Sequence, residues 1–120
     1  MEYLFSSFPH PKYLHVRATG PHGVDTAMRF MDDAYRECIA RGYDSLLMEQ
    51  ALEGPSLGPG GIFKVVQARL AEALTLKRIA YVDSLGRDDG RQFVEDAARN
   101  RGINIRVFAT VDEAERWMES

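Results

Sequence analysis

A glycine- and proline-rich stretch, Gly54–Gly61, contains the residues best suited to bind a ligand or a partner. Four of its eight residues are glycine and two are proline, and an apolar run precedes it. Proline lacks a backbone N–H and glycine loses the most entropy on ordering, so we expect a shaped loop that is neither helix nor strand. A helix should begin at its end, where free N–H groups and the helix dipole favour an anion. The candidate binding residues here are Ser56, Gly58, Gly60 and Gly61.

A second group of polar residues should lie beside this loop. Glu49 closes one apolar run, and Asp83, Ser84 and Arg87 follow the next one. Parallel strands end on the same side of a sheet, so these residues and the loop are expected to share one crevice. The alternative is that serine and glycine here simply make turns.

Other kinds of site lack a matching pattern. The glycine-rich stretch is not a Walker A loop, because no Gly-Lys-Ser/Thr follows its glycines. The carboxylates are not arranged as in a response-regulator receiver, since Gly20 follows the leading hairpin and Ala109-Thr110 follows the last strand. Asp88 and Asp89 are better explained as charges in the first turn of a helix.

The histidines and the cysteine give no catalytic or metal pattern. His10, His15 and His22 are spread over a turn, a strand and a loop, with no spacing that brings two of them to one ion. Cys38, the only cysteine, falls on the apolar side of a predicted helix and excludes an internal disulfide. We therefore expect no catalytic residue, no metal and no cofactor, and hence a protein that is not an enzyme.

The hydrophobic pattern predicts which elements carry these residues. Alternation from Tyr13 to Thr19 indicates a strand with one wet face, paired with Tyr3–Phe5 across a turn. Continuous apolar runs predict buried strands, and apolar stripes spaced by three and four predict helices. The further predicted strands are Ser45–Glu49, Ile79–Val82 and Ile103–Val107; the predicted helices are Val24–Arg41, Gly61–Leu74, Asp88–Arg101 and one launched by a capping box at Thr110–Glu113.

The order β-β-α-β-α-β-α-β-α predicts one α/β domain over residues 1–120 with a mixed five-stranded sheet. Strands joined by helices run parallel with right-handed crossovers, so the N-terminal strand is the antiparallel one. If the crossovers wind in one sense, most helices cover one face. Either the first or the last helix, or another subunit, must then cover the other face of the apolar central strands.

Composition limits the partners. The 120 residues are 45% hydrophobic and 28% charged, with a formal net charge of -3. This balance favours a globular protein without a general attraction to nucleic acid, and no apolar run reaches the ~20 residues that span a bilayer. With a single cysteine and no signal-peptide pattern at the N-terminus, we expect a cytoplasmic location.

The C-terminal third adds a resemblance. The segments Arg99–Ile103, Arg106–Thr110 and Glu113–Trp117 together resemble the closing strand and helix of small bacterial proteins in the SpoIIAA-like superfamily, which includes STAS and STAS/SEC14-like domains. The order of elements is similar over nearly the whole chain. The resemblance implies a SpoIIAA/STAS-like fold and a domain that is not an enzyme.

STAS domains switch partners when a serine in an Asp-Ser-x-Gly motif is phosphorylated at the start of the helix after the third strand. The matching position here is Ser56, although Pro55 replaces the aspartate. A literal Asp-Ser-x-Gly occurs at Asp83–Gly86, one strand too late. The resemblance therefore implies Ser56 as the candidate phosphosite.

Three functions follow as hypotheses. The first is a non-catalytic regulatory or protein-interaction module that presents Gly54–Gly61 to a partner, with Ser56 as a hypothetical phosphorylation switch. The second is a protein that binds a small anionic or lipid-like ligand, as the SEC14-type name of the relatives implies. The third is an enzyme with an unrecognised site. Self-association as a homodimer is a further hypothesis, for which the hairpin aromatic residues Tyr3, Phe5, Phe8 and Tyr13 are the candidate surface.

Overall fold

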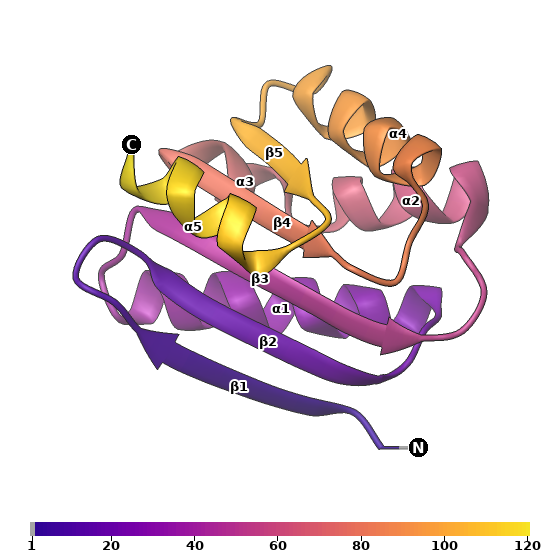
Figure 1. Cartoon of the computed structure of the whole chain (residues 1–120), viewed down its shortest axis with the longest axis horizontal. Helices are drawn as coiled ribbons and strands as arrows, with labels where there is room; N and C mark the ends of the chain where they lie inside the picture. Colours follow the sequence, from indigo (N-terminus) through magenta and orange to yellow (C-terminus); the bar gives the residue numbers. More distant parts are fainter. Residues whose placement is uncertain (1) are drawn as a thin grey trace.

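The computed structural model describes residues 2–120 and shows one five-stranded sheet flanked by five helices (Figure 1). The strands are β1 (Leu4–Pro9), β2 (Leu14–Pro21), β3 (Ser45–Glu53), β4 (Arg78–Asp83) and β5 (Ile105–Phe108), and the helices are α1 (Val24–Ala40), α2 (Gly58–Ala68), α3 (Leu70–Thr75), α4 (Asp88–Arg99) and α5 (Val111–Glu119).

The sheet confirms the predicted topology. The strands lie in sequence order, β1 pairs antiparallel with β2, and every later pair is parallel. Each parallel connection passes through at least one helix, as parallel pairing requires. Because the strand order never reverses, the successive right-handed crossovers place their helices on one face.

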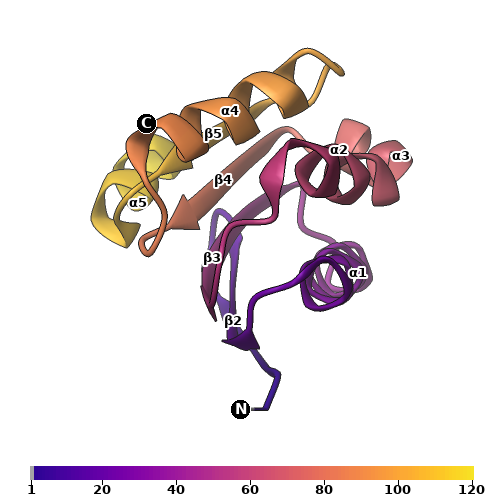
Figure 2. The same cartoon turned by 90° about the vertical axis from the view of Figure 1, so that its right-hand side faces the viewer.

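The helices form two unequal layers. Figure 2 shows α1, α2 and α3 on one side of the sheet and α5 on the other. Helix α4 belongs to the larger layer, because its Ala98 joins the same core as residues of α1 and β2. The last helix is therefore the one that covers the second face, which resolves the alternative left open by the sequence.

Each layer has its own apolar core, and alternation along the strands supplies both. In β3, Leu46 and Met48 face the core shared with α1, while Leu47 faces the core under α5. In β4, Ile79 faces the first core, and Ala80 and Val82 face the second. The second core is small, and it consists of Tyr13, Leu47, Ala80, Val82, Ala114 and Met118.

Among the boundaries that differ from the sequence-based prediction, three bear on the candidate site. Strand β3 continues to Glu53, four residues beyond Glu49. Helix α2 begins at Gly58, so the second half of the glycine-proline stretch is helical. The predicted helix to Leu74 is broken at Arg69, whose backbone (φ −134°, ψ 41°) separates α2 from α3. The Arg69 guanidinium bonds Asp32 of α1 at 2.7 Å and Glu72 of α3 at 3.0 Å, so the break fixes this residue between three helices.

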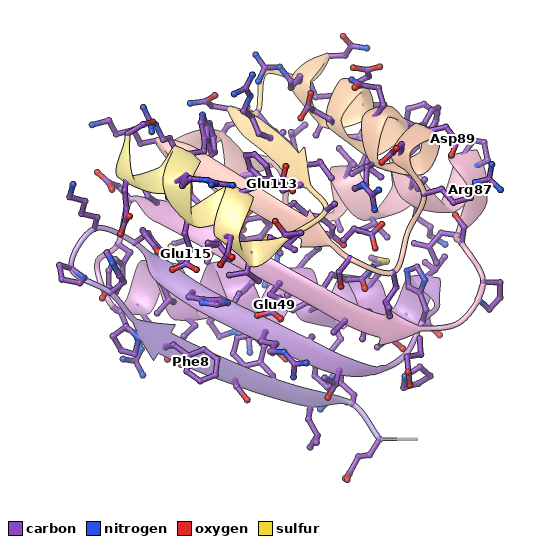
Figure 3. The ribbon with its side chains drawn as sticks, viewed as in Figure 1. Phe8, Glu49, Arg87, Asp89, Glu113 and Glu115 are labelled. Carbon is purple, nitrogen blue, oxygen red and sulfur yellow. The ribbon has the colours of Figure 1, made fainter. Side chains whose placement is uncertain are left out.

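The hairpin aromatic residues have different environments, and most do not form an open surface. Tyr13 is 1% exposed in the core under α5, so the prediction that it belongs to an interaction surface was wrong. Phe5 packs edge-on against Phe30 of α1, and the Tyr3 hydroxyl donates to Asp33 of the same helix. Phe8 alone of the four is a large exposed side chain, on the α5 side of the sheet (Figure 3).

Helix α5 begins with the predicted capping box, and this cap is open to test. The Thr110 hydroxyl accepts from the Glu113 backbone N–H at 3.2 Å and bonds the Glu113 carboxylate at 2.9 Å. Replacing Thr110 with alanine should lower the free energy of unfolding by about 1 kcal/mol, measured by urea denaturation. Thr75→Ala, at the exposed C-terminal end of α3, is the matched control and should cost less. Equal losses in the two variants would contradict a specific role for the cap.

Candidate functional site

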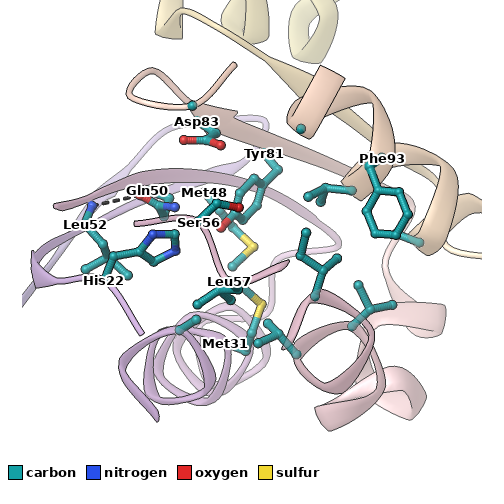
Figure 4. A pocket seen from close by; sticks show the side chains of 18 of the residues that line it. His22, Met31, Met48, Gln50, Leu52, Ser56, Leu57, Tyr81, Asp83 and Phe93 are labelled. Carbon is teal, nitrogen blue, oxygen red and sulfur yellow. Dashed lines mark hydrogen bonds between the residues drawn. The ribbon is translucent and has the colours of Figure 1, made fainter. Parts of the chain in front are cut away.

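A cavity of about 800 Å³ opens between the sheet and the larger helical layer, at the carboxyl ends of β3 and β4 (Figure 4). Helices α1, α2 and α4 form its walls, and the loops after β3 and β4 form its rim. This is the end of a parallel sheet at which ligands bind in α/β folds. Its volume lies within the range of small-molecule pockets.

The walls are mostly apolar. Met31 comes from α1, Met48 and Leu52 from β3, Leu57 from the loop, Val66 from α2 and Phe93 from α4. Met31, Met48 and Leu52 are themselves buried, so the cavity reaches into the main core. Such a lining favours an apolar ligand, because transfer of apolar surface out of water provides the driving force.

Two polar side chains interrupt this lining from the floor of the sheet. Gln50 is 3% exposed, and its Oε1 accepts the Leu52 backbone N–H at 2.8 Å. Tyr81 lines the same cavity from the neighbouring strand β4 (Figure 4). Burial raises the pKa of the Tyr81 phenol, the Asp83 charge raises it further, and the nearby Gln50 amide partly offsets the rise. The phenol is therefore neutral at physiological pH and can donate a hydrogen bond.

The turn after β4 is held tightly at the rim. Arg91 of α4 donates to the backbone oxygens of Asp83 and Gly86, each at 2.8 Å. The Asp83 carboxylate lies directly against Gly86, where an added Cβ would meet its Oδ2 at 2.2 Å. A larger residue at position 86 would displace the carboxylate from this position beside the cavity.

The loop after β3 forms the opposite rim. Ser56 and Pro55 are exposed, and Ser56, Leu57 and Gly58 line the cavity. Gly58 has φ of +76°, a left-handed conformation that favours glycine, and Pro59 fits the first turn of α2 because no N–H is needed there. The expectation that Gly54–Gly61 cannot be helical was therefore wrong for Gly58–Gly61.

The structure brings together five of the eight predicted site residues around the crevice. Ser56, Gly58, Asp83 and Arg87 line the cavity, and Ser84 lies in the Asp83–Gly86 turn at its rim without lining it. The remaining three, Gly60, Gly61 and Glu49, lie elsewhere.

Gly60 and Gly61 belong to the first turn of α2 and have no side chain to offer the cavity. A Cβ at Gly61 would lie 2.9 Å from the Leu57 Cβ and 3.2 Å from Val24 Cγ2 of α1, so this glycine lets the two helices approach closely. Its role is in packing, and the prediction that it binds a ligand finds no support in the geometry.

Glu49 lies on the opposite face of the sheet, and its predicted place in the crevice was wrong. Its carboxylate bonds His15 Nε2 at 2.9 Å and Arg17 Nε at 3.1 Å, both on β2. The error comes from the length of β3. Because the strand continues to Glu53, Glu49 is an interior position, and alternation turns the next residue, Gln50, into the cavity.

Sequence reasoning missed the residues that give the cavity its character. Two signals in the sequence could have indicated them. Gln50 is a polar residue shortly after an apolar run, and Tyr81 is the one residue with a hydroxyl group within Ile79–Val82. Tyr81 stood in a strand interpreted only as core, and Gln50 lay one residue beyond the predicted end of its strand. The apolar walls gave no signal, since their residues fit ordinary helical stripes.

Comparison with known proteins concerns the fold. A solved structure of an uncharacterized protein from the DUF3478 family of Shewanella loihica PV-4, which has a SpoIIAA-like fold, superimposes with a TM-score of 0.61. The match covers 97% of this chain and 93% of that one, at 15% sequence identity. The chain has a SpoIIAA-like fold. The resemblance noted from the C-terminal segments agrees with this result. No protein-family profile matches the sequence, and no curated protein matches it.

Within this SpoIIAA-like fold, His22 and Asp89 line the cavity, whereas Cys38, His10 and His15 lie apart from it. Cys38 is fully buried, and burial raises the pKa of its thiol to about 11, which leaves it protonated. Over residues 2–120, no three His, Cys, Asp or Glu side chains are grouped as metal ligands. In the same residues no helix combines the length and apolarity needed to cross a bilayer.

The close contact between Gly86 and Asp83 gives a testable pair of variants. Gly86→Ala should lower the free energy of unfolding by about 0.5–1 kcal/mol, because the new methyl group forces the end of the Asp83 side chain to rotate away from the rim. Gly90→Ala in α4, where a Cβ meets nothing within 4 Å, should instead raise stability by about 0.5–1 kcal/mol. Urea denaturation of both variants measures the contrast. A neutral Gly86→Ala variant would show that the turn is not constrained by this contact.

Proposed function

We propose that this chain is a non-catalytic binding protein whose cavity holds a small, predominantly apolar ligand. The observation that carries the proposal is the cavity itself, an 800 Å³ space lined by methionine, leucine, valine and phenylalanine, with few polar groups. A pocket of this kind, at the carboxyl ends of parallel strands, is the default ligand site of an α/β domain. It supports the lipid-like part of the second hypothesis drawn from the sequence.

Charge at the rim argues against the anionic part of that hypothesis. The ionisable lining residues other than the tyrosines are Asp83, Asp89, Arg87 and His22. The Arg87 side chain is 88% exposed and lies 3.5 Å from Asp89, so it is directed to solvent and already paired. Two carboxylates beside one exposed guanidinium give an anionic ligand little electrostatic attraction.

The absence of catalysis is part of the proposal. Tyr81 is a neutral donor and Gln50 is already bonded to the backbone, so neither is poised as a base or nucleophile. The proposal extends to the cytoplasmic location expected from the sequence. We assign the cavity a binding role and the groups within it a recognition role.

A probe experiment tests the binding role. 2-Acetylnaphthalene should bind the wild-type chain, and at 100 times its dissociation constant it should add about 2.7 kcal/mol to the free energy of unfolding. Leu57→Trp, which places a larger ring in the cavity wall, should weaken binding at least tenfold. Ile39→Trp, at a half-exposed position of α1 outside the cavity, is the matched control and should bind like wild type. Equal binding by all three proteins would place the probe elsewhere and overturn the proposal.

A second candidate is the interaction module with a phosphorylation switch at Ser56. The observation that favours it is that the exposed Ser56 lies just before α2, whose N-terminus has no side chain to balance its positive end. The N-cap residue Leu57 provides no side-chain hydrogen bond, and the first turn has no acidic residue. A phosphate at Ser56 would add about -1.5 to -2 charges near this helix terminus, where negative charge is favourable. In this view the loop from Gly54 to Leu57 is the segment shown to a protein partner, and self-association involves the exposed Phe8 of the hairpin.

Charge variants test the electrostatic basis of that switch. Ser56→Glu should exceed Ser56→Ala in unfolding free energy by about 0.3–1 kcal/mol at low salt, because the carboxylate meets the positive end of α2. Ser84→Glu and Ser84→Ala are the matched control variants. Because α4 already carries Asp88 and Asp89 in its first turn, we expect no difference in unfolding free energy between them. If Ser56→Glu and Ser56→Ala unfold at the same urea concentration, the helix terminus provides no switch.

A further inference from the structure

The polar groups inside the cavity define what kind of ligand it takes. Tyr81 projects its phenol into an apolar space, and none of the residues 2–120 provides a hydrogen-bond acceptor for its hydroxyl proton. The nearest candidate, the Gln50 amide oxygen, is already occupied by the Leu52 N–H. The hydroxyl is accessible from the cavity, where water can hydrate it when no ligand is bound. A ligand that displaces this water therefore binds best if it supplies a hydrogen-bond acceptor in the water's place.

The surroundings fix the protonation state of this donor. The phenol is buried and lies near the negative charge of Asp83, so it keeps its proton. The Gln50 amide lies near the phenol, and its NH2 group is the end not bonded to Leu52. Tyr81 is thus oriented to give a hydrogen bond to a ligand oxygen.

The negative charge of Asp83 favours one kind of ligand acceptor over another. A ligand carboxylate would accept a hydrogen bond from Tyr81, but it would bring a negative charge close to Asp83 in a site with low dielectric. A neutral carbonyl oxygen accepts the same hydrogen bond without that repulsion. The apolar walls fit the hydrocarbon part of such a molecule.

We infer that the cavity binds a neutral, mainly hydrocarbon molecule that carries a carbonyl group, with Tyr81 as the hydrogen-bond donor and Asp83 as the group that excludes anions. This inference rests on the proposed binding function and names its ligand class. It departs from the anionic ligand that the sequence alone suggested.

Three probes of similar size test the inference. 2-Acetylnaphthalene has the carbonyl, 2-isopropylnaphthalene lacks an acceptor, and 2-naphthoate carries a negative charge. Binding of each to wild-type protein, Tyr81→Phe and Asp83→Asn is measured by equilibrium dialysis at pH 7. Tyr43→Phe is the matched control, because it loses a hydroxyl that bonds the His10 carbonyl outside the cavity. Circular dichroism checks that every variant is folded.

The expected pattern separates the roles of the two residues. Tyr81→Phe should weaken binding of the ketone about five- to tenfold, the worth of one buried hydrogen bond, and leave the hydrocarbon unchanged. Asp83→Asn should strengthen binding of 2-naphthoate several-fold and leave the ketone within about twofold. Tyr43→Phe should change none of the three affinities.

The outcomes also separate this inference from the proposed function. If the ketone and the hydrocarbon bind wild type and are weakened by Leu57→Trp, but Tyr81→Phe changes neither, the cavity is a binding site and the carbonyl inference is wrong. Tighter binding of 2-naphthoate than of the ketone to wild type would overturn the role of Asp83. If none of the three probes binds wild type, the proposed function and the inference fail together.

Discussion

The burial of both faces of β3 and β4 is the constraint on which the rest of the structure depends. Leu46 and Met48 face one helical layer, whereas Leu47 and Ala80 face the other, so the central strands must be covered on both sides. Crossover handedness sends α1 to α4 to one face, and α5 alone is left for the second. The cavity lies in the larger layer, where α1, α2 and α4 meet the carboxyl ends of these strands.

Alternation in β3 divides the chemistry of the molecule between the two faces. Glu49 and Gln50 are neighbours in sequence, but they face opposite sides of the sheet. Glu49 pairs with His15 and Arg17 at the half-exposed face, where its charge stays hydrated. Gln50 enters the cavity as a neutral amide whose oxygen is bonded to the backbone. The deep wall therefore carries no charge of its own and suits a neutral ligand.

The sequence predicts the features of this arrangement that depend on local patterns, and it fails where a feature depends on pairing between distant segments. The capping box at Thr110, the apolar stripe through Cys38 and the continuous apolar runs of the central strands are local signals, and they predict the fold. Strand length is not local. The end of β3 at Glu53 is set by pairing with β2, where Pro21 lies opposite Glu53. Because the predicted strand ended four residues too early, Glu49 was assigned to the crevice in place of Gln50. Likewise Gly58–Gly61 reads as a loop by composition, yet it opens α2, with Gly58 in the left-handed region and Pro59 at a position that needs no N–H.

Side-chain contacts around the cavity link its walls to one another. Apolar walls alone would move together, since interiors approach the packing density of organic crystals. Arg69 bonds Asp32 and Glu72 and so fixes the spacing of α1 from α2 and α3. Arg91 ties α4 to the turn after β4 through two backbone oxygens. The edge-on contact of Phe63 and Phe93, at 5.5 Å between ring centroids, joins α2 to α4 beside the cavity. These contacts join α1, α2, α3 and α4 to one another and to the turn after β4, so they favour the helix separation that an apolar space of this size requires.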